Sequence, residues 1–316
     1  MKYIKEIREG EQVVEHYLCK SRQTFKSKND KTYLSLKLAD KTGTVDAKVW
    51  NLNNEIQSFA ENDMIKIDAT AQIFNNDIQL NVKRIRKSRE GEYDPADYIP
   101  STQKNIKEMW TEFVGYINKI SNPYIKQLLE SIFVKNAYVV KEFPGHSAAK
   151  SVHHGYWGGL LEHSLSVTQI CEFMSDKYKY IDKDVLVASA MLHDVGKLWE
   201  LSDFPLNDYT DDGQLLGHII IGSQMVKERI DTMPGFPTKL ESELIHCILA
   251  HHGELEYGSP KKPALIEAMA LNLADNADAK METMTEILRG AGDNMGWLGY
   301  NRFMETNVRR TSEYQV

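Results

Sequence analysis

The first part of the chain alternates apolar and polar positions in the manner of β-strands. Five segments between residues 12 and 85 alternate with a period of two or are rich in β-branched and aromatic residues. They are VVEHYLCK, TYLSLKLAD, TVDAKVW, DMIKIDATAQIF and IQLNVKRI. Turn-forming groups separate them, and NLNNEIQSFAEN, before the fourth segment, is compatible with one helix. This order predicts a five-stranded Greek-key barrel of the OB type over residues 1–90.

The pattern becomes helical after a short linker. Residues 91–101 contain two prolines and several charges, which is typical of a linker. From residue 102 onward, apolar residues lie three and four positions apart, as in KNIKEMWTEFVGYINKI and NPYIKQLLESIFV. We therefore expect a multi-domain α+β chain. In it a helical connecting segment (102–150) and an all-α domain with a C-terminal tail (151–316) follow the barrel.

Composition favours a soluble, cytoplasmic protein of two domains. The chain is 42% hydrophobic and 26% charged over 316 residues. The longest apolar stretch, near residues 185–192, is too short to span a bilayer, so we expect no membrane partner. The N-terminus lacks the apolar core of a secretion signal. Three widely spaced cysteines make no disulfide framework.

The charge is unevenly distributed along the chain. Residues 1–90 carry a net charge of +4 and the remainder −11. An OB barrel binds single strands through a basic groove and stacked aromatic rings. The candidate contacts of the barrel are Phe25, Trp50, Lys83, Arg84 and Arg86. The same pattern also fits aromatic residues in a barrel core and a solvated basic edge strand.

Histidine and aspartate follow a distinctive order in the helical part, where nine of the ten histidines lie at or beyond position 146. The candidate metal ligands, in chain order, are His163, His193, Asp194, His218, His251, His252 and Asp275. Several of them border apolar helix faces, where an unpaired carboxylate is destabilising. Imidazoles with carboxylates form a ligand set for Mn²⁺, Fe²⁺, Co²⁺ or Zn²⁺.

The sequence HDVGK places two further groups beside this set. The two oxygens of Asp194 can bridge two metal ions while His193 binds one of them. We expect Gly196 to end the helix in left-handed geometry and Lys197 to hold a phosphate oxygen. An ordinary cation at a helix C-terminus is the alternative for Lys197.

The order H…HD…H…HH…D resembles the HD superfamily of metal-dependent phosphohydrolases over roughly residues 150–290. With the predicted barrel and the motifs GGLLEHSLSV, HDVGK, HHGELEYGSPKKP and LADNADAK, nearly the whole chain resembles the YhaM family of bacterial exoribonucleases. That resemblance implies hydrolysis of single-stranded RNA from the 3′ end to nucleoside monophosphates, and leaves single-stranded DNA open as a second substrate. It also implies Mn²⁺ or Co²⁺ as the ions; the ligand set accepts Fe²⁺ as well.

The resemblance also implies residue roles. His163, His193, Asp194 and Asp275 would hold a first metal ion, and His218, His251 and His252 a second, with Asp194 as the bridge. His252 is the ligand most open to an indirect role. Asp194 and Lys197 are the expected catalytic residues. The weaker substrate contacts are His154, which follows His153, and Ser259 and Lys261 in the loop YGSPKKP; an ordinary surface loop fits these positions equally well.

Two other functions fit parts of the pattern. HD-type sites also hydrolyse small nucleotides, so a nucleotidase or a cyclic-nucleotide phosphodiesterase is one alternative, although the barrel would add little to it. A non-catalytic RNA-binding protein is the other, and the complete ligand set argues against it. Self-association is left open by the sequence.

Overall fold

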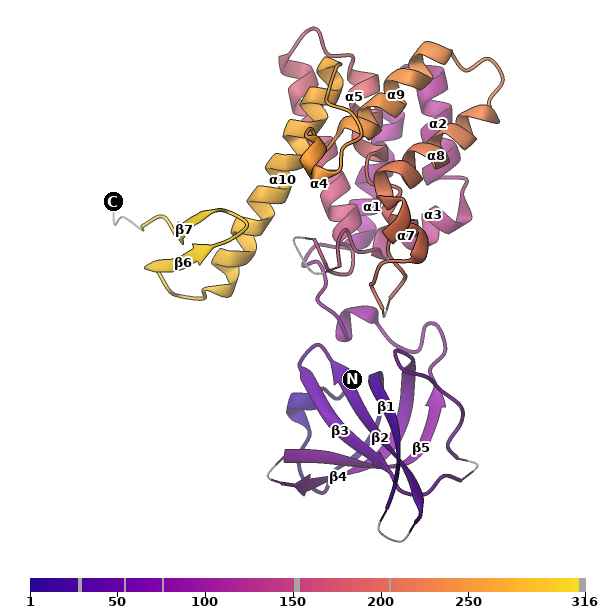
Figure 1. Cartoon of the computed structure of the whole chain (residues 1–316), viewed down its shortest axis with the longest axis vertical. Helices are drawn as coiled ribbons and strands as arrows, with labels where there is room; N and C mark the ends of the chain where they lie inside the picture. The colour runs from indigo at the N-terminus through magenta and orange to yellow at the C-terminus, as the bar shows by residue number, and fades with distance from the viewer. Residues whose placement is uncertain (28–29, 54, 76, 151–153, 205, 313–316) are drawn as a thin grey trace. The chain divides into compact units, whose positions relative to one another are not determined.

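The computed structural model describes residues 1–27, 30–53, 55–75, 77–150, 154–204 and 206–312. Contacts divide the chain into two units (Figure 1). The first comprises Met1–Ser101 with Phe204–Leu206, and the second comprises Thr102–Asp203 with Asn207–Val316. The predicted fold class is confirmed, since a five-stranded barrel is followed by a helical domain.

The barrel is closed in the strand order β1-β2-β3-β5-β4. Its five strands, in chain order, are β1 (Gln12–Lys26), β2 (Thr32–Asp40), β3 (Gly43–Val49), β4 (Met64–Phe74) and β5 (Asp77–Lys87). β3 and β5 run parallel, and the other neighbours are antiparallel. Buried and less buried residues alternate along most of β4, which is the pattern of a strand with one face on a core.

The prediction of a helix between β3 and β4 is wrong. Among the described residues of 50–63, the segment runs without a helix and pairs at Ile56 with Ile85 of β5. Gln57 N–H donates to the Ile85 carbonyl at 2.9 Å, and Ile85 N–H donates to the Glu55 carbonyl at 3.0 Å. β3 pairs with β5 only through Gln79–Asn81, so this segment satisfies backbone groups that β3 leaves unpaired.

Helices form the second unit. In chain order they are α1 (Ile106–Gly115), α2 (Pro123–Phe133), α3 (Ala137–Glu142), α4 (Gly159–Lys177), α5 (Lys183–Leu192), α6 (Lys197–Glu200), α7 (Asp211–Leu215), α8 (Gly217–Asp231), α9 (Thr238–Ala250) and α10 (Ile266–Gly290). Asparagine side chains accept backbone N–H groups at the starts of α1, α2 and α3, at Asn105, Asn122 and Asn136. These caps satisfy orphan donors and fix where each helix begins.

The segment that precedes the histidine-rich region belongs to the same core. Phe113, Phe133 and Phe143 are buried with ring centroids 5.2–5.5 Å apart. They share one hydrophobic cluster with Leu160 of α4 and Leu271 of α10. The helices of 102–150 therefore pack on those that carry the candidate ligands.

A β-hairpin follows α10 and was not predicted. Its strands are β6 (Trp297–Asn301) and β7 (Thr306–Arg309), which pair antiparallel at the end of α10 (Figure 1). No helix in the described ranges combines the length and the apolar character that crossing a membrane requires.

Candidate metal centre

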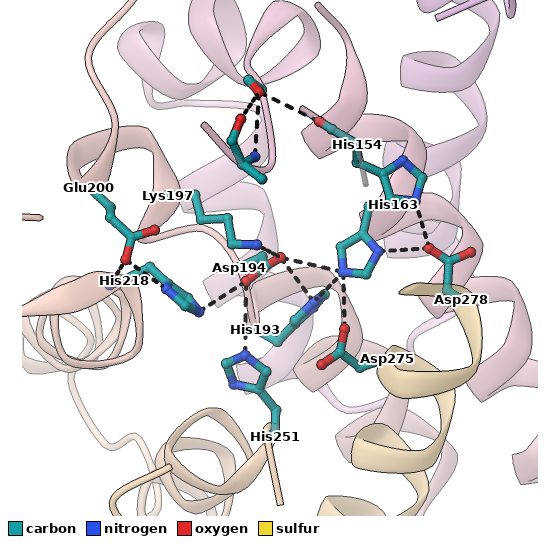
Figure 2. Close-up of polar contacts among 12 residues, drawn as sticks. His154, His163, His193, Asp194, Lys197, Glu200, His218, His251, Asp275 and Asp278 are labelled. Carbon is teal, nitrogen blue, oxygen red and sulfur yellow. Dashed lines mark hydrogen bonds and ion pairs between the residues drawn. The ribbon is translucent and has the colours of Figure 1, made fainter. Parts of the chain in front are cut away.

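The candidate ligands come from five different places in the helical unit and meet around Asp194 (Figure 2). His163 lies on α4, His193 caps the C-terminal end of α5, His218 is near the start of α8, His251 caps α9, and Asp275 lies on α10. Asp194, between α5 and α6, is 2% exposed. The helices thus bring residues up to 112 positions apart into one buried site.

The two oxygens of Asp194 face different histidines. Oδ2 lies 3.4 Å from Nε2 of both His163 and His193. Oδ1 lies 3.4 Å from Nε2 of His218 and 3.9 Å from Nε2 of His251. One carboxylate therefore stands between two groups of imidazole nitrogens, as a bridging ligand must.

Each group can close around an ion. One atom each of His163, His193 and Asp275 lie within 4.8 Å of one another, and the same holds for His218, His251 and His252. His163 Nε2 is 3.1 Å from Asp275 Oδ1 and 3.2 Å from His193 Nε2. The structure thus gathers the residues into the two sets that the resemblance implied; their role as metal ligands stays a prediction.

The other ring nitrogen of four histidines is already engaged. Nδ1 lies 2.8 Å from the Ala190 carbonyl in His193 and 2.7 Å from the Ile248 carbonyl in His251. Carboxylate oxygens take this position at the other two: Asp278 at 2.7 Å from His163 and Glu200 at 2.9 Å from His218. An acceptor at Nδ1 favours the tautomer with its proton there, which leaves the Nε2 lone pair free for a metal.

A third histidine group is better explained as a hydrogen-bond network. Asp278 Oδ2 lies 2.7 Å from His163 Nδ1 and 3.0 Å from His154 Nε2, and Asp278 Oδ1 accepts the hydroxyl of Ser166. The other nitrogen of His154 is 3.0 Å from the hydroxyl of Tyr156. These are direct contacts, so Asp278 holds His154 and His163 in place. His153 lies outside the described residues.

Buried polar atoms without partners show that the site fits a cation. Oδ1 of Asp194 and Nε2 of His218 and His251 are buried and have no hydrogen-bond partner within the described ranges. Leaving such atoms unpaired is costly, and a buried charge more so. Divalent ions coordinated by these donors would satisfy them, with no thiolate needed.

The electrostatics of the site hold Asp194 ionised. Burial raises the pKa of Asp194, but Lys197 and the histidines lower it by more. The pKa of Asp194 therefore lies well below its usual range. Lys197 Nζ is 2.9 Å from Asp194 Oδ2, and this charge keeps the pKa of Lys197 raised despite its burial. Burial opposes protonation of His163, yet hydrogen bonds to Asp275 and Asp278 raise its pKa to about 10. His163 and Lys197 thus keep their protons beside the carboxylate of Asp194, and a metal ion bound at His163 would displace the proton of that ring.

The site opens onto a cavity of about 480 Å³. Its lining includes members of both histidine groups, with Lys197 and Asp194 on its wall. Residues that are not candidate metal ligands also line the cavity: Ala148, Ala149, His154, Glu200, Leu201, Tyr209, Asn272, Asn276, Ala279 and Lys280. A volume of this size lies in the range of small-ligand sites.

The prediction that Gly196 ends a helix in left-handed geometry is wrong. Lys197 nevertheless lies at the site, on the cavity wall. Gly196 has φ −64°, in the right-handed region, and precedes α6, so Lys197 begins a helix. A Cβ at Gly196 would lie 2.1 Å from the His218 carbonyl oxygen and 2.6 Å from Gly222 N. Close packing against α8 explains the glycine here, and backbone freedom does not.

The loop residues Ser259 and Lys261 do not line the cavity. Ser259 is 2% exposed, and its hydroxyl donates to the carbonyls of Leu249 and Lys261. Its donor is therefore used to hold the loop. Lys261 is exposed, and its contact with substrate stays a prediction.

The barrel exposes two of the aromatic candidates. Phe25 and Trp50 are 43% and 42% exposed and lie on either side of Tyr33. Ring centroids are 5.8 Å apart for Phe25 and Tyr33 and 4.6 Å apart for Tyr33 and Trp50. Lys48 Nζ lies 5.9 Å from the Tyr33 ring centroid. We call Phe25, Tyr33 and Trp50 the aromatic row.

Most of the basic candidates of the barrel are paired with carboxylates. Arg84 lies 3.5 Å from Glu55, and Arg86 forms two hydrogen bonds with Glu92, at 2.7 and 2.9 Å. Lys83 is exposed. The positive charge counted from the sequence is therefore partly neutralised on the barrel surface.

Some residues around the cavity were missed from the sequence. Glu200 accepts both the backbone N–H and the ring of His218, each at 2.9 Å, and Asn272 donates to the His251 carbonyl. Tyr209 and Lys280 lie on the cavity wall. The contacts that place Glu200 and Asn272 are tertiary, so no local pattern singled these residues out.

Comparison with known proteins matches residues 160–280 to the HD domain family. Two solved structures are similar in fold to a part of this chain. The second OB-fold domain of replication protein A from Methanococcus maripaludis is 16% identical, with a TM-score of 0.23 over 28% of this chain and 96% of that one. An OB domain from Thermoplasma acidophilum is 16% identical, with a TM-score of 0.22 over 29% of this chain and 89% of that one.

The matched range 160–280 contains every candidate ligand that surrounds Asp194. The topology of residues 12–87 is that of a closed five-stranded OB-type barrel. The chain therefore joins an N-terminal OB-type barrel to an HD-domain metal-dependent phosphohydrolase.

Proposed function

We propose that this chain is a 3′-to-5′ exoribonuclease, which hydrolyses single-stranded RNA to nucleoside monophosphates with Mn²⁺ as the favoured ion. The observation that carries the proposal is the shared carboxylate of Asp194 between two imidazole groups, at the wall of a cavity that also contains Lys197. The polarity and the preference for RNA rest on the resemblance of the motifs to YhaM-type exoribonucleases.

The reaction is the hydrolysis of one phosphodiester bond. The water oxygen forms a bond to phosphorus, the bond from phosphorus to the 3′-oxygen of the upstream nucleotide breaks, and that oxygen takes up a proton. Divalent ions bound by the two groups would supply Lewis-acid stabilisation of the phosphate and a water of lowered pKa. His163, His193 and Asp275 would hold one ion, and His218, His251 and His252 the other.

Lys197 provides positive charge where the phosphate must sit. The charge of Asp194 raises the pKa of the Lys197 ammonium, so this group stays protonated. It lies on the cavity wall and can donate to a phosphate oxygen. Lys280 is exposed on the same cavity and can pair with the next phosphate. These two lysines would orient the strand end against Asp194.

The barrel would bind the strand upstream of its end. The aromatic row offers exposed ring faces beside Lys48, which suits unpaired bases and a phosphate backbone. Each base stacked on an aromatic ring contributes about 1–3 kcal/mol and does so for any base. Such a surface suits an enzyme that degrades RNA regardless of sequence.

The proposal is tested with RNA labelled at either end. Purified protein with Mn²⁺ should release labelled mononucleotide at once from 3′-labelled RNA and give a shrinking ladder from 5′-labelled RNA. EDTA should stop both reactions. Release from the 5′ end would reverse the polarity. Failure to cleave either RNA, together with hydrolysis of a cyclic or free mononucleotide, would replace the proposal with a small-nucleotide phosphodiesterase or nucleotidase.

Removing the aromatic row should weaken RNA binding without altering its salt dependence. We expect Phe25→Ala with Trp50→Ala to raise the Kd for single-stranded RNA about tenfold or more, because stacking is lost. The slope of log K against log salt should stay unchanged, since no phosphate contact is removed. Fluorescence anisotropy in EDTA measures both quantities.

The matched control is Phe74→Ala, which removes a ring of the barrel that is 56% exposed and lies outside the aromatic row. It should leave the Kd unchanged. Equal weakening by the control and by the double variant would mean that the barrel binds RNA without this row.

A further inference from the structure

The hairpin β6–β7 presents aromatic side chains to solvent. Trp297, Tyr300 and Phe303 are 68%, 64% and 72% exposed. Large exposed rings in a cluster mark an interaction surface more often than isolated ones do. The mechanism above uses none of them.

The hairpin is built so that two of these rings share a face. Residues three apart on a regular strand point to opposite sides of it. The register shifts by one residue between Trp297 and Tyr300, where Gly299 has φ +91°. This bulge places Trp297, opposite Arg309, on the same face as Tyr300, opposite Asn307. We call these four residues the hairpin platform.

The opposite face anchors the hairpin to α10. Val308 is 2% exposed, and Arg310 donates to the carbonyls of Leu288 at 2.8 Å and Gly292 at 3.1 Å. These bonds satisfy carbonyls at the end of the helix. The hairpin is therefore held on one side, and the platform is left to solvent.

The platform carries one positive charge, on Arg309, and no acidic residue, and it follows an acidic part of the chain. Residues 91–290 contain 18 Lys and Arg against 29 Asp and Glu, whereas residues 291–316 contain three arginines and three acids. The Arg309 guanidinium lies 5.9 Å from the Trp297 ring centroid. Within the described part of the chain, no carboxylate forms an ion pair with Arg302 or Arg309.

This chemistry selects a polyanion with flat rings. A second copy of the chain docked by a two-fold axis would set the platform against itself, because such an interface is isologous. That arrangement opposes Arg309 with its own copy, and like charges across an interface are costly. A single strand of nucleic acid instead offers unpaired bases to the rings and a phosphate to Arg309.

We propose that the hairpin platform binds single-stranded nucleic acid upstream of the end that enters the metal centre. The statement that the strand bound by the platform is also cleaved at the metal centre rests on the proposed function. α10 carries Asp275 and continues for fifteen residues to Gly290, which is about 22 Å along the helix axis. A dinucleotide bound at the metal centre is too short to cover this distance and should therefore not sense the platform.

The test uses a full-length double variant that combines Trp297→Ala and Tyr300→Ala, and compares it with wild type. We expect the Kd for a fluorescent oligouridylate of about 20 nucleotides to rise about tenfold or more in EDTA. Cleavage of a dinucleotide with Mn²⁺ should stay unchanged. Tyr180→Ala, at a position 91% exposed elsewhere in the same unit, is the control and should bind as wild type does. Arg309→Gln should lower the salt slope by about one.

An unchanged Kd in the double variant overturns the proposal. Loss of self-association in light scattering, with unchanged RNA affinity per subunit, would overturn it in favour of a second copy as the partner. Binding is measured in EDTA, so a wild type that binds RNA through the platform but hydrolyses nothing with Mn²⁺ would retain this inference and refute the exoribonuclease.

Discussion

Replacement of Asp194 by Asn should abolish hydrolysis while RNA binding persists. The two oxygens of Asp194 face His163 and His193 on one side and His218 and His251 on the other. An amide offers one weak ligand where the carboxylate offers two charged ones. We expect kcat to fall at least about a thousandfold, which is about 4 kcal/mol of barrier.

Asn is preferred to Ala because it keeps the shape of the side chain. Asp194 is buried against the ammonium of Lys197, and removing one partner of a buried pair typically costs about 3–5 kcal/mol of stability. Loss of activity in Asp194→Ala alone could therefore reflect unfolding. Circular dichroism and thermal melting of both variants separate the two causes.

The assay measures Mn²⁺-dependent release of mononucleotide, and RNA affinity is measured in EDTA. Asp176→Ala is the control, because Asp176 is an exposed carboxylate that pairs with Lys183 at 2.9 Å, away from the cavity lining. It should keep full activity. Metal-dependent hydrolysis retained by a folded Asp194→Asn protein would refute the assignment of Asp194 as the shared ligand.

The sequence was most informative where a local pattern and the tertiary structure agree. Strands of the barrel alternate in burial because one face meets the core, and this alternation is visible in DMIKIDATAQIF. The candidate ligands could be predicted as a set because imidazoles and aspartates beside apolar helix positions are costly unless something binds them. Their order along the chain then indicated a family.

Predictions failed where a distant partner decides the outcome. The segment 50–63 could have formed a helix, but free backbone groups of β5 near Ile85 pair with it instead. A glycine was expected at position 196 because of its left-handed backbone geometry. In the structure, close packing against His218 and Gly222 leaves no room for a side chain there. The pairing of Arg86 with Glu92 neutralised a charge that the sequence had counted as available.

The hairpin shows a different limit. Its strands are short, and Trp297 and Tyr300 lie three residues apart, so no alternation with a period of two is visible. The bulge at Gly299 is what aligns them, and a single glycine does not reveal a bulge from sequence alone.

Two carboxylates behind the histidines should tune the two metal positions separately. Asp278 accepts from His163, and Glu200 accepts from His218, each through Nδ1 on the side away from Asp194. Such partners orient a ligating imidazole and raise its basicity, and their loss typically weakens metal affinity by about 10–100-fold. Asp278→Asn should therefore weaken the ion held by His163, His193 and Asp275, and Glu200→Gln should weaken the other.

Titration of metal-free protein with Mn²⁺ by calorimetry measures both affinities and the stoichiometry. Each variant should lose one of two binding steps and recover activity at high Mn²⁺, because the ligands themselves remain. Ser166→Ala is the control for Asp278, since it removes a hydroxyl that contacts Asp278 but leaves the bond to His163. A residue that only stabilised the fold would lower the melting temperature and both affinities alike, and its activity would not return with added metal. Selective loss, with rescue by Mn²⁺, is thus the result that ties each carboxylate to its own side of Asp194.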